Sequence, residues 1–189
     1  MDKKNQLMED FEKKVSLTDT EAMEPEAAAS SSSSSSSKSS NTLLLLRRFL
    51  ETQQRRAQAY AKLKQGFAEY MVSGGELAYQ QLCSKITEEF NDCSKQVIEI
   101  ESLFLKPDHD RDDLADLLRA IQTQEKQKLH LTATIQLLKK AAAGTEEAEA
   151  DAEYDNALKE AIRGVQDSVT TINEHLEEIK YEIAALEAQ

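Results

Sequence analysis

Hydrophobic side chains recur along this 189-residue chain in steps of three and four, in four separate stretches. Such steps place side chains on one face of an α-helix, because a helix has about 3.6 residues per turn. Two stretches carry the pattern without a polar interruption. The first, at about 76–105, presents Cys83, Ile86, Phe90, Cys93, Val97, Ile100 and Phe104; the second, at about 154–187, presents Leu158, Ile162, Val165, Val169, Ile172, Leu176, Ile179, Ile183 and Leu186.

The other two stretches carry the stripe with polar gaps. Residues 43–71 present Leu43, Leu46, Leu50, Ala57, Tyr60, Phe67 and Met71, with a flanking column of Phe49, Leu63 and Tyr70. Residues 110–141 present Leu114, Leu117, Ile121, Leu131, Ile135 and Leu138, with Leu118 beside them. A stripe wider than one column is typical of a helix that packs against two neighbours.

Capping and turn residues separate these stretches. Asn41 or Thr42 can cap the first helix, because its side-chain oxygen can accept a free backbone N–H. Two glycines at 74 and 75 end that helix, since glycine readily adopts positive φ. Pro107 ends the second helix, and the aspartates of 108–113 suit the positive start of the third.

The fold class predicted is therefore all-α: an elongated antiparallel helical bundle or coiled coil of about four long helices. The bundle spans 43–189, with helices at approximately 43–71, 76–105, 110–141 and 154–187 joined by short connections. Residues 1–42, acidic and serine-rich, are predicted to be a disordered tail because they have little to bury. A short amphipathic piece near Leu7, Met8 and Phe11 could fold on a partner. Residues 141–153 are left open between helix and linker.

Charge is distributed unevenly over these elements. The net charge is −12, yet residues 43–71 carry six basic and two acidic residues, while residues 144–189 carry thirteen acidic and three basic ones. Heptad spacing puts Arg48, Arg55 and Lys62 in the outermost column of the first helix, with Arg47 and Arg56 at its flanks. Three explanations stay open: a solvated outer face, a column that binds a protein partner, and direct binding of nucleic acid. A column this small would give only weak, salt-sensitive DNA binding. The last helix could overhang the others and supply a homodimer surface.

Reactive constellations are missing from the sequence, so no catalytic, cofactor-binding or metal-binding residues are predicted. There is no glycine-rich phosphate loop, Cys-x-x-Cys pair, His-Glu-x-x-His motif or serine-nucleophile elbow. Cys83 and Cys93 lie ten residues apart. On one helix that separation is about 15 Å, which is too far for a disulfide. Asp108, Asp110 and Asp112 begin like a calcium loop, but Asp113 and Arg119 stand where that loop needs glycine and glutamate. No stretch is apolar enough to span a membrane and no secretory signal opens the chain, so we expect an intracellular protein.

A family resemblance rests on the first two helices. The first carries Arg56, Ala57, Tyr60, Leu63, Gly66 and Tyr70, and the second carries Ser94, Lys95, Val97 and Glu101. In these positions the chain resembles the Required for excision 1-B DNA-repair family over roughly residues 43–140. The resemblance implies participation in excision of damaged bases or nucleotides, and it supplies no catalytic residues to carry over.

Two functions are weighed from these observations. The first is a nuclear, non-enzymatic helical adaptor that supports DNA repair by contacting repair proteins, with Arg47, Arg48, Arg55, Arg56 and Lys62 as candidate contact residues. The alternative is a cytoplasmic coiled-coil scaffold of a cytoskeletal, ciliary or trafficking complex.

Overall fold

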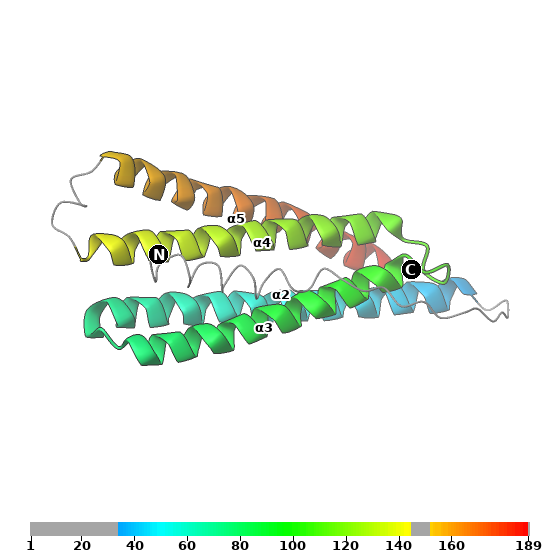
Figure 1. Cartoon of the computed structure of the whole chain (residues 1–189). Coiled ribbons are helices and arrows are strands. Elements are labelled where there is room, and N and C mark those ends of the chain that lie inside the picture. Colours follow the sequence, from blue (N-terminus) through cyan, green and yellow to red (C-terminus); the bar gives the residue numbers. More distant parts are fainter. Residues whose placement is uncertain (1–33, 145–151, 189) are drawn as a thin grey trace.

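Four long helices make up the computed structural model, which describes residues 34–144 and 152–188. They are α2 (Ser34–Ser73), α3 (Glu76–Phe104), α4 (Asp112–Ala142) and α5 (Ala152–Glu187). Successive helices run antiparallel, so α2 and α3 form one hairpin and α4 and α5 form a second (Figure 1). The all-α antiparallel bundle expected from the sequence is confirmed. Within the described residues, no helix is both long and apolar enough to cross a membrane.

Most helix boundaries lie within two residues of those predicted, with one exception at the start of α2. The first helix is already formed at Ser34, so the prediction that it begins at Asn41 or Thr42 is wrong. Adding residues to a helix that packing has nucleated costs little, which allows even serines to extend it. The predicted disordered tail spans residues 1–42: residues 34–42 are helical, contrary to the prediction, and residues 1–33 lie outside the described residues. The open segment 141–153 ends α4 and begins α5, and its middle lies outside the described residues too.

The α2–α3 connection is a tight turn made by Gly74 and Gly75. Gly74 has φ 69°, a value that glycine adopts without the clash that a Cβ would cause. Glycine also permits close helix packing at two places. A Cβ at Gly66 would collide with Leu82 of α3, and one at Gly164 would lie 2.6 Å from Leu131 Cδ1 of α4. Each hairpin therefore has one point at which its two helices approach closely.

Two hydrophobic cores fill the bundle. We call the end where α2 begins proximal and the end with the α2–α3 turn distal. All four helices contribute to the proximal core, which holds Leu46, Phe49, Val97, Ile100, Phe104, Leu114, Ala115, Leu118, Ile121, Ile172 and Ile179. Only α2, α3 and α4 build the distal core, which holds Ala59, Leu63, Ile86, Phe90 and Leu129. The predicted seam of α3 is confirmed in both cores, with Cys83 at its edge.

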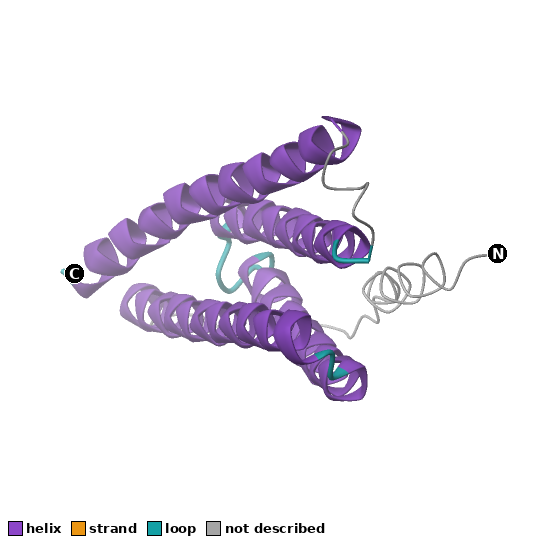
Figure 2. Cartoon of the chain, turned by 90° about the vertical axis from the view of Figure 1, so that its left-hand side faces the viewer, coloured by secondary structure: helices purple, strands orange, loops and turns teal. Residues whose placement is uncertain are grey.

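The last helix contributes to the four-helix core over only half of its length. Its predicted seam is buried at Ile172 and Ile179, but Ile162 and Val169 are each 38 % exposed. In this N-terminal half the buried residues are Ala161 and Ser168, one position away from the predicted seam. Figure 1 shows the reason: α5 crosses behind α4, so that only its C-terminal half approaches α2. Figure 2, the view toward the distal end, shows the same divergence.

The proximal core makes a direct prediction for two adjacent residues. Phe104 is fully buried and Leu105 is 48 % exposed. Phe104→Ala should lower the free energy of unfolding by about 3–5 kcal/mol, because it leaves a cavity. Leu105→Ala should lower it by less than about 1 kcal/mol. Urea denaturation followed by circular dichroism measures both, and equal losses would contradict this description of the core.

Candidate partner-binding surface

Two basic residues of α2, Arg48 and Arg55, lie along its boundary with α3, where each pairs with a carboxylate. Arg55 donates from Nε and Nη2 to Glu89 Oε1 at 3.0 and 2.8 Å, and from Nη2 to Asp92 Oδ2 at 2.7 Å. Arg48 Nη2 donates to Glu99 Oε2 at 2.8 Å. These bonds to Asp92 and Glu89 raise the pKa of Arg55, so its charge is permanent. Two of the three members of the basic column, Arg48 and Arg55, are thus paired with acidic residues of α3.

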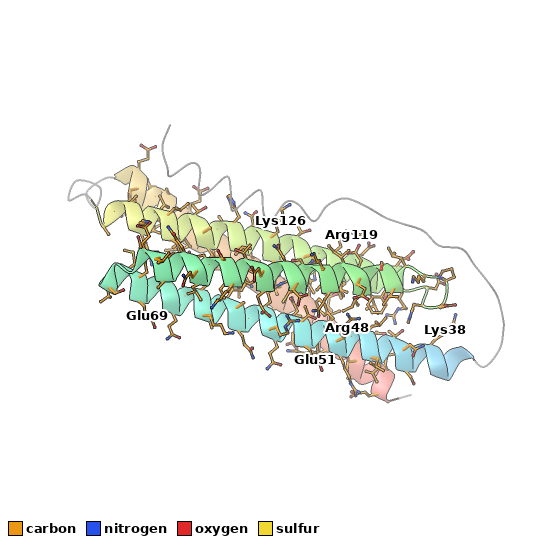
Figure 3. The ribbon with its side chains drawn as sticks, turned by 60° about the horizontal axis from the view of Figure 1, so that its bottom comes forward. Lys38, Arg48, Glu51, Glu69, Arg119 and Lys126 are labelled. Carbon is orange, nitrogen blue, oxygen red and sulfur yellow. The ribbon has the colours of Figure 1, made fainter. Side chains whose placement is uncertain are left out.

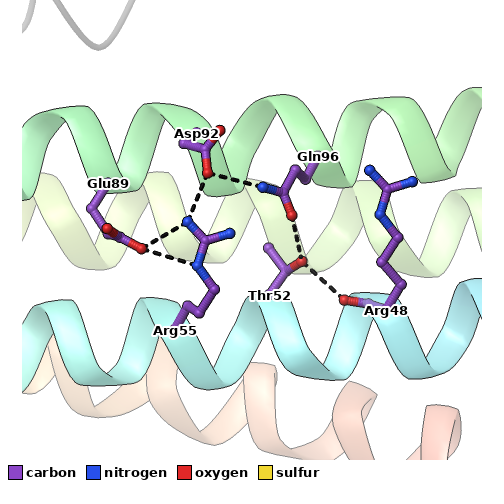
Figure 4. Close-up of polar contacts among 6 residues, drawn as sticks. All are labelled: Arg48, Thr52, Arg55, Glu89, Asp92 and Gln96. Atoms are coloured by element: carbon purple, nitrogen blue, oxygen red, sulfur yellow. Dashed lines mark hydrogen bonds and ion pairs between the residues drawn. The ribbon is translucent and has the colours of Figure 1, made fainter.

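A chain of polar contacts leads from the Arg55–Asp92 ion pair to the backbone of Arg48, as Figure 4 shows. Gln96 Nε2 donates to Asp92 Oδ2 at 2.9 Å, and its Oε1 lies 3.3 Å from Thr52 Oγ1. The Thr52 hydroxyl donates to the backbone oxygen of Arg48 at 2.9 Å. The surface between α2 and α3 is therefore a continuous ladder of paired polar groups.

The outermost position predicted for Arg48 and Arg55 is wrong, because both reach sideways onto α3. Figure 3 places Arg48 between α2 and α3, whereas Arg119 and Lys126 lie on α4. Arg47 pairs with Glu187 of α5 at 2.7 Å. Lys62 is exposed and makes no ion pair with the described residues. Whether any of these residues binds a partner remains a prediction.

Arg56 is not a surface residue at all, contrary to its predicted place at the flank of the column. Its side chain is 1 % exposed. Its guanidinium donates to Gln53 Oε1 of α2 at 2.8 Å, to Ser94 Oγ of α3 at 3.2 Å and to Gln122 Oε1 of α4 at 2.6 Å. Gln122 Nε2 in turn donates to the backbone oxygen of Ser94 at 3.2 Å. One buried cation therefore holds atoms from three helices.

A second polar group lies next to this network. Glu125 is 8 % exposed, and its Oε2 lies 2.8 Å from Lys128 Nζ at ion-pair distance, without the alignment of a hydrogen bond. Tyr60 donates its hydroxyl proton to the backbone oxygen of Glu125 at 3.3 Å, and Lys128 Nζ lies 4.1 Å from the Tyr60 ring centroid. The Tyr60 ring also packs on Phe90, with centroids 4.6 Å apart. This cluster joins α4 to the distal core.

Burial dominates the electrostatics of this cluster. It lowers the pKa of Lys128, against the attraction of Glu125, and the charge of Arg56 lowers it further. Burial also raises the pKa of Tyr60, and the charge of Glu125 adds to that rise. The Glu125 carboxylate lies at ion-pair distance from Lys128, whereas neutral oxygens accept the hydrogen bonds of Arg56. Such groups stay inside only when hydrogen bonds replace water, and here they do so for the guanidinium.

One sequence signal for the buried network was overlooked. Phe49, Leu63 and Tyr70 were recognised as a flanking column, and Arg56 occupies the one place in that seven-residue repeat which they leave open. The flanking column proves to be the inner one, because Phe49 and Leu63 are buried while Ala57 and Met71 of the predicted stripe are exposed. Apolar groups at the distal turn were also missed: Val72 is 91 % and Leu77 is 70 % exposed.

The aspartates of 108–113 and the two cysteines are the remaining groups that the sequence raised as candidates. Asp112 and Asp113 lie in the first turn of α4, as predicted, whereas Asp108 and Asp110 precede the helix and no side chain caps its start. Asp113 pairs with Arg111, and this contact lowers the pKa of the Asp113 carboxyl. Cys83 and Cys93 are both free thiols. Among residues 34–144 and 152–188, His, Cys, Asp and Glu side chains form no group of three that could hold a metal ion.

The neighbours Arg55 and Arg56 should respond differently to the same substitution. Arg56→Ala leaves a cavity and deprives Gln53, Ser94 and Gln122 of their donor, so we expect a loss of at least about 3 kcal/mol in unfolding free energy. Arg55→Ala removes half-exposed ion pairs and should cost at most about 1 kcal/mol. Chemical denaturation of the two variants measures this difference. A costlier Arg55→Ala would disprove the assignment of Arg56 to the interior.

Tyr60 predicts a pH dependence of stability. Its folded pKa lies above that of the unfolded chain, so its stabilising contribution is complete below about pH 10 and falls as the pH rises further. The loss is at most about 1.4 kcal/mol per pH unit for one such group. Tyr60→Phe should therefore weaken the decline of unfolding free energy between about pH 10 and 11.5. Tyr181→Phe, at a position 75 % exposed, is the control and should retain the wild-type slope.

Comparison with known proteins assigns most of the region described above to a protein family. A protein-family model described as DNA repair REX1-B matches residues 44–139. The comparisons with curated proteins and with solved structures gave no match. The matched range contains α3, most of α2 and most of α4, and with them the whole Arg56 network, but no part of α5. Because the match covers more than half of its 189 residues, the chain belongs to the DNA repair REX1-B family.

Proposed function

We propose that the protein acts in DNA repair as a non-enzymatic adaptor that contacts other repair proteins. The observation that carries this proposal is the family match over residues 44–139, which coincides with the three-helix unit α2–α4. In the interior of that unit, Arg56 is hydrogen-bonded to Gln53, Ser94 and Gln122. Its outer surface, with charged ladders and exposed apolar groups at the turn, is suited to binding other proteins. A repair role also places its site of action in the nucleus.

Protein contacts account for the charge pattern better than contacts to DNA do. Affinity for DNA comes largely from basic side chains that neutralise phosphates. On α2, Arg47, Arg48 and Arg55 already pair with carboxylates, and the whole chain carries −12. A DNA-binding role would require these ion pairs to exchange for phosphates. Retention on DNA at low salt, lost steeply at moderate salt, would favour that alternative.

The structure leaves fewer candidate contact residues than the sequence suggested. Arg47, Arg48, Arg55 and Lys62 remain, whereas Arg56 is enclosed and could meet a partner only if the bundle opened. Lys62 is the best residue to test, because it is exposed and its substitution breaks no ion pair among the described residues. Reversing Arg55 would bring a new carboxylate against Glu89 and Asp92, which would confuse binding with stability.

Cells that lack the protein provide the test. They should be more sensitive to ultraviolet or oxidative DNA damage, and the wild-type chain should restore survival. The Lys62→Glu variant should fold but restore survival only partly. Lys126→Glu makes the same charge change at an exposed position on α4 and should restore it fully. Unchanged survival without the protein would count heavily against a repair role.

Affinity capture with the same variants separates the adaptor from the scaffold alternative. An adaptor should retain nuclear repair proteins, fewer of them with Lys62→Glu, and the same set with Lys126→Glu. If cytoskeletal or tethering subunits are captured instead, while damage survival is unchanged, the cytoplasmic scaffold is the better description.

A further inference from the structure

The N-terminal half of α5 has an apolar edge that neither core covers. Leu158 and Val165 are half-buried, and Ile162 and Val169 are each 38 % exposed. None of these four belongs to the proximal or the distal core. On the adjoining side of the helix Ala161 and Ser168 are buried, and Gly164 lets α4 approach closely at Leu131. This half of α5 therefore packs on one helix, while its apolar stripe is wide enough for two.

We propose that residues 7–15 of the same chain dock on this edge of α5. This segment contains Leu7, Met8, Phe11 and Val15, and the steps of four from Leu7 to Phe11 and Val15 would put these residues on one face of a helix. The segment lies outside the described residues, and the tether that joins it to the bundle ends at Ser34, the start of α2. The proposal does not depend on the proposed function.

The tether is long enough for this contact. Glu187 pairs with Arg47, and α5 runs antiparallel to α2, so distances along the two helices add. At a helical rise of about 1.5 Å per residue, Ser34 to Arg47 spans roughly 20 Å, and Glu187 back to Val169 spans roughly 27 Å. The extended chain from Val15 to Ser34 can reach up to about 65 Å. Val15 can therefore reach Val169, and Leu7 can then lie further along α5, towards Ile162.

Tethering and charge favour this occupant over a second copy of the chain. A tether of this length holds the segment at an effective concentration on the order of 1 mM, far above micromolar protein. Helix α5 carries nine acidic and three basic residues, so two copies of it would repel each other at low salt. Residues 1–18 hold four acidic and four lysine side chains and meet no such repulsion.

Hydrogen–deuterium exchange of the full-length protein tests the contact. Leu7→Asp together with Phe11→Asp should release the segment and speed amide exchange in residues 158–169 several-fold. The control, Asn5→Asp together with Gln6→Asp, adds the same two charges away from the apolar face of the segment and should leave exchange unchanged. Equal exchange in both variants and the wild type would overturn the proposal.

Photo-crosslinking identifies the occupant directly. The chain with Phe11 replaced by benzoylphenylalanine should crosslink to α5 in a product of monomer mass, and Ile162→Asp should abolish that product. Crosslinks of dimer mass would show that a second copy occupies the edge, and crosslinks only to other helices would show that the segment docks elsewhere. Either result would overturn the proposal.

Discussion

The buried guanidinium of Arg56 is the interaction on which the arrangement of α2, α3 and α4 depends. A cation at 1 % exposure is tolerated only where hydrogen bonds replace water, and Arg56 obtains one acceptor from each of these three helices. Hydrophobic contacts are non-directional, so they specify the relative position of the helices less strictly than hydrogen bonds do. A shift of any helix would leave the guanidinium with an unpaired donor, so this one residue specifies the register of all three.

The register of the helices determines which charged residues pair on the surface. Once α2 and α3 are aligned by Arg56, Arg48 and Arg55 lie opposite Glu99, Glu89 and Asp92 and pair with them. Exposed pairs of this kind contribute little to stability, but they cancel the field that the basic column would otherwise exert. A partner that approaches α2 therefore meets a pattern of alternating charges, which specifies an orientation more than it supplies long-range attraction.

Helical periodicity predicted the four helices, their order and the buried seam of α3, because these features follow from residues close in sequence. The orientation of α2 could not be read in the same way. Its two candidate columns differ by one residue, and the choice between them depends on Gln122 and Ser94, which are remote in sequence and close only in the folded chain. The ion pairs of Arg48 and Arg55 were missed for the same reason, since spacing along one helix does not reveal the charges on its neighbour. The apolar column interrupted by Arg56 was a usable signal, because an arginine at such a position is either exposed or bonded inside.

The last helix presents the opposite case. Its apolar repeat is the most regular in the chain, yet it is buried only where all four helices meet, at Ile172 and Ile179. Regular spacing establishes that a helix has an apolar face. It does not establish that the rest of the chain supplies a surface to cover that face. The family match ends before α5, and the three-helix unit it covers has a distal core that needs nothing from α5. The distal core of α2–α4 is thus formed without α5. In the described chain, the N-terminal half of α5 keeps part of its apolar face uncovered, which leaves room for another segment.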